Sequence, residues 1–488
     1  MTGSAFMPAA VELLRLLPEI LLIGAGTLVM VAEAASGGRR ARQLGHACLA
    51  ALGAALFASV AAFWRPGPAF SGLVIVDGFA TFFRVLVIVA GALVAVFSGP
   101  YLRREGAERG EYYALLLYSA AGQCLMASAA ELIVLFIALE VSSIASYVLA
   151  GYLRSDRRNN EAAIKYFLLG SFASAFLLYG VALSYGAAGS TRLTDIRTAL
   201  QDPVTPPAVL VGAAAALIFV GFAFKVSAAP FQVWAPDVYQ GAPAPVSAFL
   251  SAGPKAAAFA GLLRVFMTAF APAAAQWEKV LWASALATMI IGNFAALLQT
   301  DIKRLLAYSS IAHAGYVMVA VAAHTAVGTA AAMFYLAAYI FMNVGAFAFV
   351  SYFARQGERY VKVEDLSGLA WRQPATAALL SLFLLSLIGV PLTAGFFGKF
   401  YVFKAALEAG LVWLTVLGLL NSAVAAYYYL RILVVMYMRE PTAATAELPA
   451  PGAAYKATFW VSALATLVLG VFPGLVLNFA TGAAKLGG

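Results

Sequence analysis

The chain has 488 residues, of which 63% are hydrophobic and only 11% are charged. Because soluble globular proteins carry about 25% charged residues, this composition excludes an ordinary soluble fold and indicates a polytopic protein embedded in membrane lipid. The formal net charge of +9 does not indicate a nucleic-acid partner, since most basic residues lie in short loops between apolar segments, where they orient a membrane protein.

Apolar segments long enough to cross a bilayer follow one another along the whole chain. A spanning helix needs roughly 20 such residues, and about fourteen segments meet that length. They lie near residues 9–33, 43–63, 75–99, 111–129, 131–153, 161–188, 207–229, 244–270, 278–299, 303–323, 327–354, 374–406, 410–438 and 456–480. The first segment lacks the basic start and cleavage site of a signal peptide, so we expect it to be retained. The sequence therefore predicts an all-α membrane protein.

The loops alternate in their content of lysine and arginine. The richer set lies near residues 39–42, 103–109, 154–158, 303–304, 355–372 and 439. The poorer set consists of Arg65, Arg192, Arg197 and Lys279. The positive-inside rule places the richer set in the cytoplasm. With an even number of spans, both termini then lie on the periplasmic side, and the link 231–243 lies on the cytoplasmic side.

The most unusual stretch covers residues 221–263 and places one lysine deep inside each of two apolar segments. Pro230 follows Lys225 closely, and Pro254 directly precedes Lys255. A lysine in hydrocarbon is energetically costly and indicates a functional site. Each proline removes a helical hydrogen bond, so we expect a helix break beside each lysine, lining a pathway through the protein.

A second interrupted segment lies late in the chain, over residues 384–403. Gly389 and Pro391, with two further glycines, make it a poor continuous helix, and it carries Lys399. An interrupted segment in each half of a membrane protein indicates an internal inverted repeat with sites at the breaks. The lysine precedes the proline in the first segment and follows it in the second.

One carboxylate accompanies these lysines. Glu140 lies well inside its apolar segment, where it either takes up a proton or finds a cation, and Lys225 is the natural candidate. The two residues predict either a functional pair or a plain structural ion pair between helices. Lys255 has no carboxylate nearby in the sequence. Burial disfavours its charged form, so it can accept and release protons, unless it extends to the membrane surface.

One late span combines a histidine with other polar residues. His313 titrates near neutrality and suits a proton relay, although such a histidine can also be a hydrogen-bonded packing residue. Tyr308 adds a polar atom to the same helix, and Lys303 at its start either extends the polar path or anchors the helix at the membrane surface. Lys165, one turn into its own span, either neutralises Glu161 or belongs to the path.

Signals for redox or nucleotide chemistry are missing from the sequence. Gly24 and Gly26 lie within an apolar span and lack the third glycine of a dinucleotide-binding motif, so they indicate helix packing. Two cysteines, Cys48 and Cys124, are too few for a zinc or iron–sulfur site, and there is no phosphate loop or haem-binding pair of histidines. The sequence predicts no cofactor in this chain.

Four stretches around the ionisable residues carry a family resemblance. They are KVSAAPFQVWAPDVYQGAPAPVSAFLSAGPK at 225–255, EAAIKYFLLGSFAS at 161–174, KRLLAYSSIAHAGY at 303–316 and GVPLTAGFFGKFYV at 389–402. They resemble the antiporter-like subunits of respiratory complex I, the NADH:quinone oxidoreductase of bacteria. The PDVYQGAP form at 236–243 is most similar to the subunit N family, and the resemblance runs roughly over 111–438.

The resemblance implies fourteen helices, with two inverted five-helix repeats and two discontinuous helices. It divides the chain into an N-terminal flank over 1–110, a first repeat over 111–270, a second repeat over 271–438, and a C-terminal loop and helix over 439–488. It implies the bacterial inner membrane as the location and other membrane-arm subunits, including neighbouring antiporter-like ones, as partners. NADH, FMN, iron–sulfur clusters and quinone would then bind in other subunits.

The resemblance also implies proton translocation coupled to NADH oxidation and quinone reduction elsewhere in the complex. Protons would move through buried side chains and water. Glu140 and Lys225 would form a coupling pair, and Lys255 would be the central proton carrier. Lys399 would be the terminal carrier, with His313 among the bridging residues.

Four further polar positions are expected to assist this path: Lys165, Lys303, Tyr308 and Gln232. The family often has a histidine where this chain has Gln232. Glutamine does not titrate, so a hydrogen-bonding role is expected there rather than protonation.

Two other functions compete with this interpretation. A subunit of a multi-subunit cation/proton antiporter or of a membrane-bound hydrogenase would share the broken helices and lysines, and only the PDVYQGAP form argues against it. An independent transporter of an anionic solute would also use half-helix ends and lysines. Such a site would normally gather its polar residues in one place, whereas here the ionisable groups are spread singly along the chain.

Overall fold

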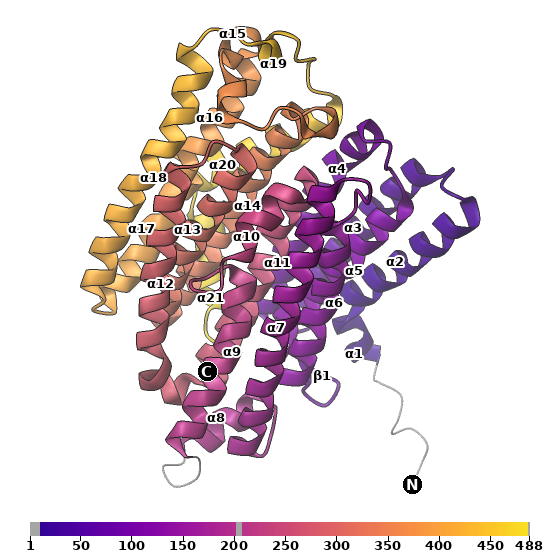
Figure 1. Ribbon diagram of the computed structural model, residues 1–488. Coiled ribbons are helices and arrows are strands. Elements are labelled where there is room, and N and C mark those ends of the chain that lie inside the picture. Colours follow the sequence, from indigo (N-terminus) through magenta and orange to yellow (C-terminus); the bar gives the residue numbers. More distant parts are fainter. Residues whose placement is uncertain (1–9, 202–206, 487–488) are drawn as a thin grey trace.

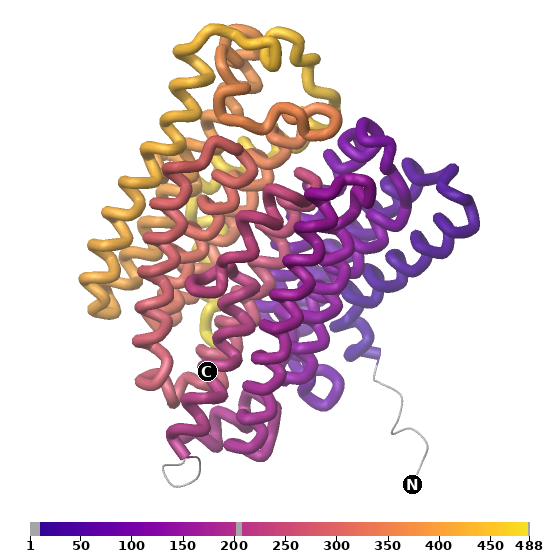
Figure 2. The backbone as a smooth tube through the Cα atoms, in the orientation of Figure 1, coloured from indigo at the N-terminus to yellow at the C-terminus, as the bar shows by residue number. Residues whose placement is uncertain are grey.

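Long α-helices make up nearly all of the computed structural model, which describes residues 10–201 and 207–486 (Figures 1 and 2). In the first half of the chain they are α1 (Ala10–Arg15), α2 (Leu17–Ser36), α3 (Ala41–Phe63), α4 (Gly78–Arg104), α5 (Gly110–Ser128), α6 (Leu132–Ala150), α7 (Arg157–Ala188), α8 (Leu193–Gln201), α9 (Ala208–Val226), α10 (Trp234–Gly241) and α11 (Ala244–Arg264). In the second half they are α12 (Ala274–Leu297), α13 (Ile302–Ala322), α14 (Ala326–Phe353), α15 (Leu369–Arg372), α16 (Pro374–Ile388), α17 (Ala394–Glu408), α18 (Val412–Met438), α19 (Ala443–Ala446), α20 (Ala453–Val471) and α21 (Gly474–Ala483).

Short irregular helices join some of these elements. They are η1, a π-helix over Val265–Ala269, and the 3-10 turns η2 (Ala271–Ala273), η3 (Gln356–Glu358) and η4 (Val363–Leu366). The expected first segment begins at residue 9, which lies outside the described residues, as do both chain ends.

Twelve of the described helices are long and apolar enough to cross a membrane. They are α2, α3, α4, α6, α7, α9, α11, α12, α13, α14, α18 and α20. Two of the expected segments are not among them. Helix α5 has the length but carries polar residues such as Ser119 and Gln123, and residues 374–406 form the two shorter helices α16 and α17. The protein is therefore an all-α polytopic membrane protein with about twelve candidate spans.

Three helices, α11, α13 and α14, form the centre of the bundle. In the apolar part of each, 94% of the residues are buried, against 33% in α2 and α3. A helix that is apolar on every side is one that other helices surround. Helix α11 packs against α4, α5, α9 and α14 (Figure 1). Ionisable side chains on α11 and α13 are thus enclosed by protein instead of facing lipid.

The first interrupted segment is confirmed, because α9 ends at Val226 directly after Lys225. Ser227 adopts a left-handed conformation with φ +62°, and the short helix α10 follows after a non-helical link. The free backbone groups of the link bind side chains of α12. Thr288 Oγ1 accepts from the Ala229 N–H at 2.8 Å, and Ser284 Oγ donates to the Ala229 carbonyl at 2.5 Å. Broken backbone at membrane depth is tolerated when protein satisfies it in this way.

The expected break at Pro254 is wrong, because α11 continues without interruption from Ala244 to Arg264. A proline inside a helix removes one hydrogen bond and crowds the preceding turn. Here α11 is enclosed by neighbouring helices, and the residues around Lys255 are buried apart from Pro254, which is half-buried. Tertiary packing therefore outweighs the local cost of the proline. Lys255 lies in the middle of an intact helix.

The second interrupted segment is confirmed between α16 and α17. Gly389 ends α16 with φ +97°, a conformation that favours glycine, and its N–H donates to the carbonyls of Leu385 and Ser386. Lys399 on α17 donates to the carbonyl of Ile388 at 2.7 Å, at the negative end of α16. The last expected segment is also divided, because α20 and α21 are separated at Phe472 and Pro473.

One end of the bundle carries a small hairpin, a departure from the all-α pattern. Its strands β1 (Gly67–Ala69) and β2 (Val74–Val76) pair antiparallel, with Pro68 opposite Ile75. Helix α1 contacts β1, and Ala483 at the end of α21 lies against Gly78 at the start of α4. Both described ends of the chain therefore lie at the hairpin end, while α15 and α19 lie at the opposite end (Figure 1).

Candidate functional site

Lys225 lies in the last turn of α9 and directs its ammonium group at α6. Its Nζ donates to Ser143 Oγ at 2.7 Å and to Tyr147 Oη at 3.1 Å. The rings of Tyr147, Tyr166 and Phe224 lie 5.1, 5.7 and 5.4 Å from Nζ, within the range of cation–π attraction. The charge is therefore stabilised by neutral partners.

Glu140 lies on α6, one turn before Ser143. Its Oε1 accepts a hydrogen bond from Ser174 Oγ on α7 at 2.5 Å. The ion pairs among the described residues do not include Glu140 with Lys225, so the direct structural pair considered from the sequence is absent. The two groups nevertheless lie at the same face of α6. Lys225 binds the hydroxyl of Ser143, and Ser143 follows Glu140 by three residues on that helix. Their coupling role stays a prediction.

Lys255 is the most enclosed of the three intramembrane lysines, with 2% of its surface exposed. Its Nζ donates to the carbonyl oxygen of Ser310 on α13 at 3.0 Å and also to the Ser310 hydroxyl. None of the ion pairs among the described residues includes Lys255. Burial of this kind rules out the alternative in which the side chain extends to the membrane surface. An ammonium group without a counter-ion at such a depth is costly.

His313 lies on α13 three residues after Ser310, and both of its ring nitrogens contact phenols. Nδ1 is 2.6 Å from the hydroxyl of Tyr335 on α14, and Nε2 is 3.3 Å from that of Tyr429 on α18. The Tyr429 hydroxyl also bonds to Ser309. Because each hydroxyl can both donate and accept, these residues form a polar connection from α13 to two neighbouring helices.

Lys399 on α17 is buried against the break between α16 and α17. Besides the Ile388 carbonyl, its Nζ donates to Ser422 Oγ on α18 at 2.7 Å. The ammonium group also lies 4.9 Å from the ring centroid of Tyr316 on α13. A mostly apolar cavity of about 470 Å³ opens beside Lys399. This lysine, too, has neutral partners.

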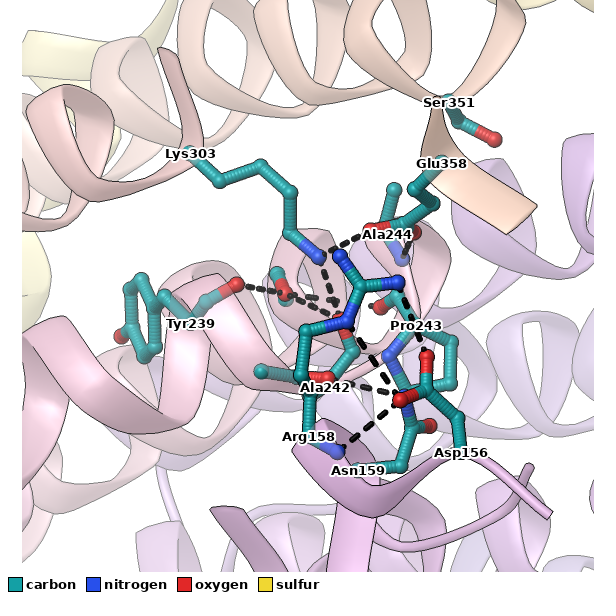
Figure 3. Close-up of polar contacts among 12 residues, drawn as sticks. Asp156, Arg158, Asn159, Tyr239, Ala242, Pro243, Ala244, Lys303, Ser351 and Glu358 are labelled. Atoms are coloured by element: carbon teal, nitrogen blue, oxygen red, sulfur yellow. Dashed lines mark hydrogen bonds and ion pairs between the residues drawn. The ribbon is translucent and has the colours of Figure 1, made fainter. Parts of the chain in front are cut away.

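Lys303 is almost fully buried, so its expected alternative as an anchor at the membrane surface is wrong. Its Nζ donates to the Ala242 carbonyl at 2.5 Å and forms an ion pair of 2.6 Å with Glu358 (Figure 3). Ala242 directly follows α10, at the joint to α11. The sequence did not indicate Glu358, because it lies 55 residues away in a charged loop.

Lys165 belongs to a network of ion pairs near the surface. Its Nζ is 2.6 Å from Glu161 and 2.7 Å from Asp237, whose other oxygen lies 2.7 Å from Arg304. The expected neutralisation of Glu161 is confirmed. Asp237, on α10, is an additional partner that spacing along α7 could not reveal.

The two remaining auxiliary positions have different surroundings. Gln232 lies in the link after α9, and its Oε1 is buried without a hydrogen bond from the described residues. The ring of Tyr308 lies 5.8 Å from the guanidinium carbon of Arg304, one turn earlier on α13. Among the described contacts, Tyr308 is joined to Arg304 instead of to His313.

The arrangement can hold and exchange protons, because lysines and a histidine alternate with hydroxyl groups. Lys255 of α11 binds Ser310 of α13, and His313 follows Ser310 by three residues, about one turn, on the same helix. Sequence reasoning missed Ser143, Tyr335, Tyr429 and Ser422, which come from other helices. In the sequence, these four residues stand out only as hydroxyl-bearing side chains within otherwise apolar segments. In the part of the chain that the structure describes, no group of three or more His, Cys, Asp or Glu residues could hold a metal ion.

Comparisons with known proteins agree with this geometry. The family described as "NADH:quinone oxidoreductase/Mrp antiporter, TM" matches residues 129–425. NADH-quinone oxidoreductase subunit N 1 of Solibacter usitatus is 62% identical over 483 residues, covering 98% of both chains.

Solved structures extend the comparison to the fold. A chain of respiratory complex I from Thermus thermophilus with bound aureothin matches with a TM-score of 0.79 and 36% identity, covering 96% of this chain and all of that one. A chain of the Mrp complex from a Dietzia species has a TM-score of 0.85 at 24% identity, covering 98% of this chain and 97% of that one, and shows a shared fold. With this geometry and these relatives, the chain belongs to the subunit N family of NADH-quinone oxidoreductases, within the antiporter-like membrane proteins.

Proposed function

We propose that this chain is the proton-translocating subunit N in the membrane arm of a bacterial NADH:quinone oxidoreductase. One observation carries the proposal. Three lysines inside the bundle donate to hydroxyl and carbonyl oxygens and form no ion pair among the described residues: the buried Lys255 and Lys399 and the half-buried Lys225. Without a counter-ion, a buried ammonium group is less strongly held in its charged form, so it can release and regain a proton.

The proposed path follows the polar contacts through the bundle. Glu140 and Lys225 form the coupling pair, through their shared face of α6. Lys255 is the central carrier and passes protons by way of Ser310 toward His313 and its tyrosine partners. Lys399 is the terminal carrier, and the adjoining cavity supports its access to the outside. Four further residues assist proton movement along this path: Lys165, Lys303, Tyr308 and Gln232.

The proposed membrane topology has fourteen crossings. It adds α5 and the α16–α17 pair to the twelve candidate spans. The two broken segments support two inverted five-helix repeats, over 111–270 and 271–438, between flanks at 1–110 and 439–488. Both described ends lie at the hairpin end of the bundle, as an even number of crossings requires. By the positive-inside rule, that end faces the periplasm, and so do both termini.

The proposed assembly places the chain beside other membrane-arm subunits, including neighbouring antiporter-like ones, in the bacterial inner membrane. NADH, FMN, iron–sulfur clusters and quinone bind in other subunits, and this chain performs no redox step. Exposed apolar residues on its outer helices, such as Phe172 and Phe176 on α7, suit contact with lipid or with these partners. Nucleic acid is not a partner.

Substitution of Lys255 tests the proposal. Arginine keeps the positive charge but does not release its proton at working pH, so Lys255→Arg should lose proton pumping. If the charge were only structural, arginine would work, and the neutral near-isostere in Lys255→Met would fail through misassembly. The measurement is proton pumping and quinone reductase activity in membranes, normalised to assembled complex. Normal pumping by the arginine variant would make Lys255 a fixed charge.

A further inference from the structure

The loop between α14 and α15 has an unusual backbone at its start. Arg355, Gly357 and Glu358 have φ values of +57°, +68° and +47°. For residues other than glycine, this left-handed region is uncommon and persists only where surrounding contacts hold it. Here the Gly357 N–H donates to a carboxylate oxygen of Glu105 at 3.0 Å, and Arg158 donates to the Gly357 carbonyl at 3.2 Å. Backbone strain that surrounding contacts hold at a charged residue suggests that the position of the Glu358 side chain is functionally important.

The strained loop presents the carboxylate of Glu358 to the joint between α10 and α11. One oxygen accepts from the Ala244 N–H at 2.8 Å and from the Tyr101 hydroxyl at 2.8 Å. The other oxygen pairs with Lys303, which also binds the Ala242 carbonyl (Figure 3). A carboxylate thus meets the positive end of α11, and an ammonium group meets the negative end of α10.

Glu358 is the more exposed member of its pair with Lys303. A polar cavity of about 230 Å³ opens at this end of the bundle and is lined by both residues together with Lys165, Asp237 and Glu161. A second cavity, of about 540 Å³, reaches Glu358 from the side of Tyr101 and Glu105. The side chain of Glu358 is 11% exposed, whereas that of Lys303 is 1% exposed. Water in the second cavity, which Lys303 does not line, can therefore reach the carboxylate without meeting the lysine.

Asp156, a second carboxylate beside this cavity, is paired with an arginine, Arg158. Burial works against the charge of Asp156, but hydrogen bonds from Arg158 outweigh it and keep the pKa of Asp156 below its usual value. Both side chains lie beside Glu358 in Figure 3. An arginine partner keeps its proton, whereas a lysine partner can give one up. Glu358 is paired with such a lysine.

Helix α13 leads from this pair toward the centre of the membrane. Ser310, which binds Lys255, follows Lys303 by seven residues on α13. Seven residues make almost two helical turns, so the two side chains share one face of the helix, about 10 Å apart along its axis. Lys303 of α13 and Lys255, which reaches Ser310 from α11, thus lie along the same side of α13.

We propose that Glu358 is the residue through which protons enter this chain from the cytoplasmic cavity, with Lys303 as the group that passes them inward. The proposal rests on the proposed function. Lys303 first transfers its proton, through intervening water, to the unprotonated amine of Lys255, and Lys303 itself becomes a neutral amine. Glu358 takes up a proton from water, becoming a carboxylic acid, and then donates that proton to the Lys303 amine. The carboxylate and the ammonium group are both restored, and one proton has moved inward.

A purely structural clamp at the joint is the competing explanation, and variants of the pair separate the two. Removing one partner of a buried ion pair leaves an uncompensated charge, whereas removing both leaves none. If the pair is only a clamp, Glu358→Gln combined with Lys303→Met should restore pumping relative to Glu358→Gln alone. If Glu358 is the uptake group, the double variant assembles but pumps slowly, because no group there titrates. Glu358→Asp, which keeps the carboxylate, should retain most of the activity.

The experiment measures proton pumping by the complete complex in membrane vesicles, normalised to assembled complex. We expect Glu358→Gln to slow pumping about tenfold or more, the low end of what removing a positioned proton donor costs. Glu447→Gln serves as the matched control, because Glu447 is exposed and pairs with Arg355 of the same loop. Wild-type pumping by Glu358→Gln or by the double variant would overturn the proposal, as would equal loss in Glu358→Asp.

Lys255→Met, in the same preparation, separates this proposal from the proposed function. If Lys255→Met fails to pump while Glu358→Gln pumps normally, only the role of Glu358 is refuted. If Lys255→Met also pumps normally, proton translocation through this chain is refuted as well.

Discussion

Buried cations in this protein occur in two kinds of surroundings. Within the bundle, Lys225, Lys255 and Lys399 donate to hydroxyl and carbonyl oxygens. Closer to the hairpin end, Arg84 is just as deeply buried but lies 2.7 Å from the carboxylate of Glu19. Arg84, Lys255 and Lys399 are buried and Lys225 is half-buried, so burial alone does not separate the paired cation from the unpaired ones.

The difference supports the proposed division of the charges into fixed and exchangeable ones. A carboxylate partner stabilises a buried cation in its charged form, and loss of either member of the pair is strongly destabilising. Neutral oxygens support the ammonium group less, so the neutral amine becomes accessible. Among these four cations the arginine is the paired one, as expected from the much stronger hold of guanidinium on its proton. Lys303 differs from both kinds, because it is a buried lysine that has a carboxylate partner, Glu358.

Breaking the fixed pair should give the largest effect on stability. Arg84→Met leaves the carboxylate of Glu19 buried without its cation and should cost about 3–5 kcal/mol. We expect little assembled complex, measured by native electrophoresis of solubilised membranes. Arg84→Met together with Glu19→Gln removes both charges and should recover most of the assembly. Wild-type levels of complex in the single variant would show that this pair is not a structural charge.

Removing an exchangeable charge should affect transport instead of assembly. Lys225→Ala and Glu140→Ala should each reduce proton pumping and coupled quinone reduction by about tenfold or more, in the range for loss of a positioned proton-transfer group. Lys225 donates to neutral hydroxyl groups and forms no direct ion pair among the described residues, so its removal breaks no ion pair and the complex should assemble. Assembly is quantified in the same membranes. Wild-type pumping by both assembled variants would refute the coupling pair.

The smallest effect is expected for a paired lysine close to solvent. The side chain of Lys165 is 41% exposed and pairs with Glu161, whose side chain is 64% exposed. Exposed ion pairs contribute roughly 0–1 kcal/mol, so Lys165→Met should leave assembly and pumping within about twofold of wild type. The same pumping assay checks this. A loss as large as that of Lys225→Ala would instead make Lys165 a principal group of the proton path, beyond the auxiliary role proposed for it.

Part of this site could be predicted because apolar surroundings make a charged residue conspicuous. Lys225, Lys255, Lys399 and Glu140 each interrupt a run of hydrocarbon side chains, and the helix breaks near Lys225 and Lys399 followed from proline and glycine. Lys303 was harder to interpret, because a lysine at the start of a span is more often a surface anchor. Its burial depends on a loop that arrives from another part of the chain.

By itself, the sequence determined which groups are ionisable and that they lie inside a membrane, since the length and apolarity of the segments leave no other place for them. Only the tertiary structure decided which of those charges are paired. Hydrogen-bond partners such as Tyr335 for His313 and Ser310 for Lys255 come from other helices, and no local pattern encodes that meeting. The same reason explains why α11 is intact at Pro254, because the packing of surrounding helices compensates for one lost backbone hydrogen bond.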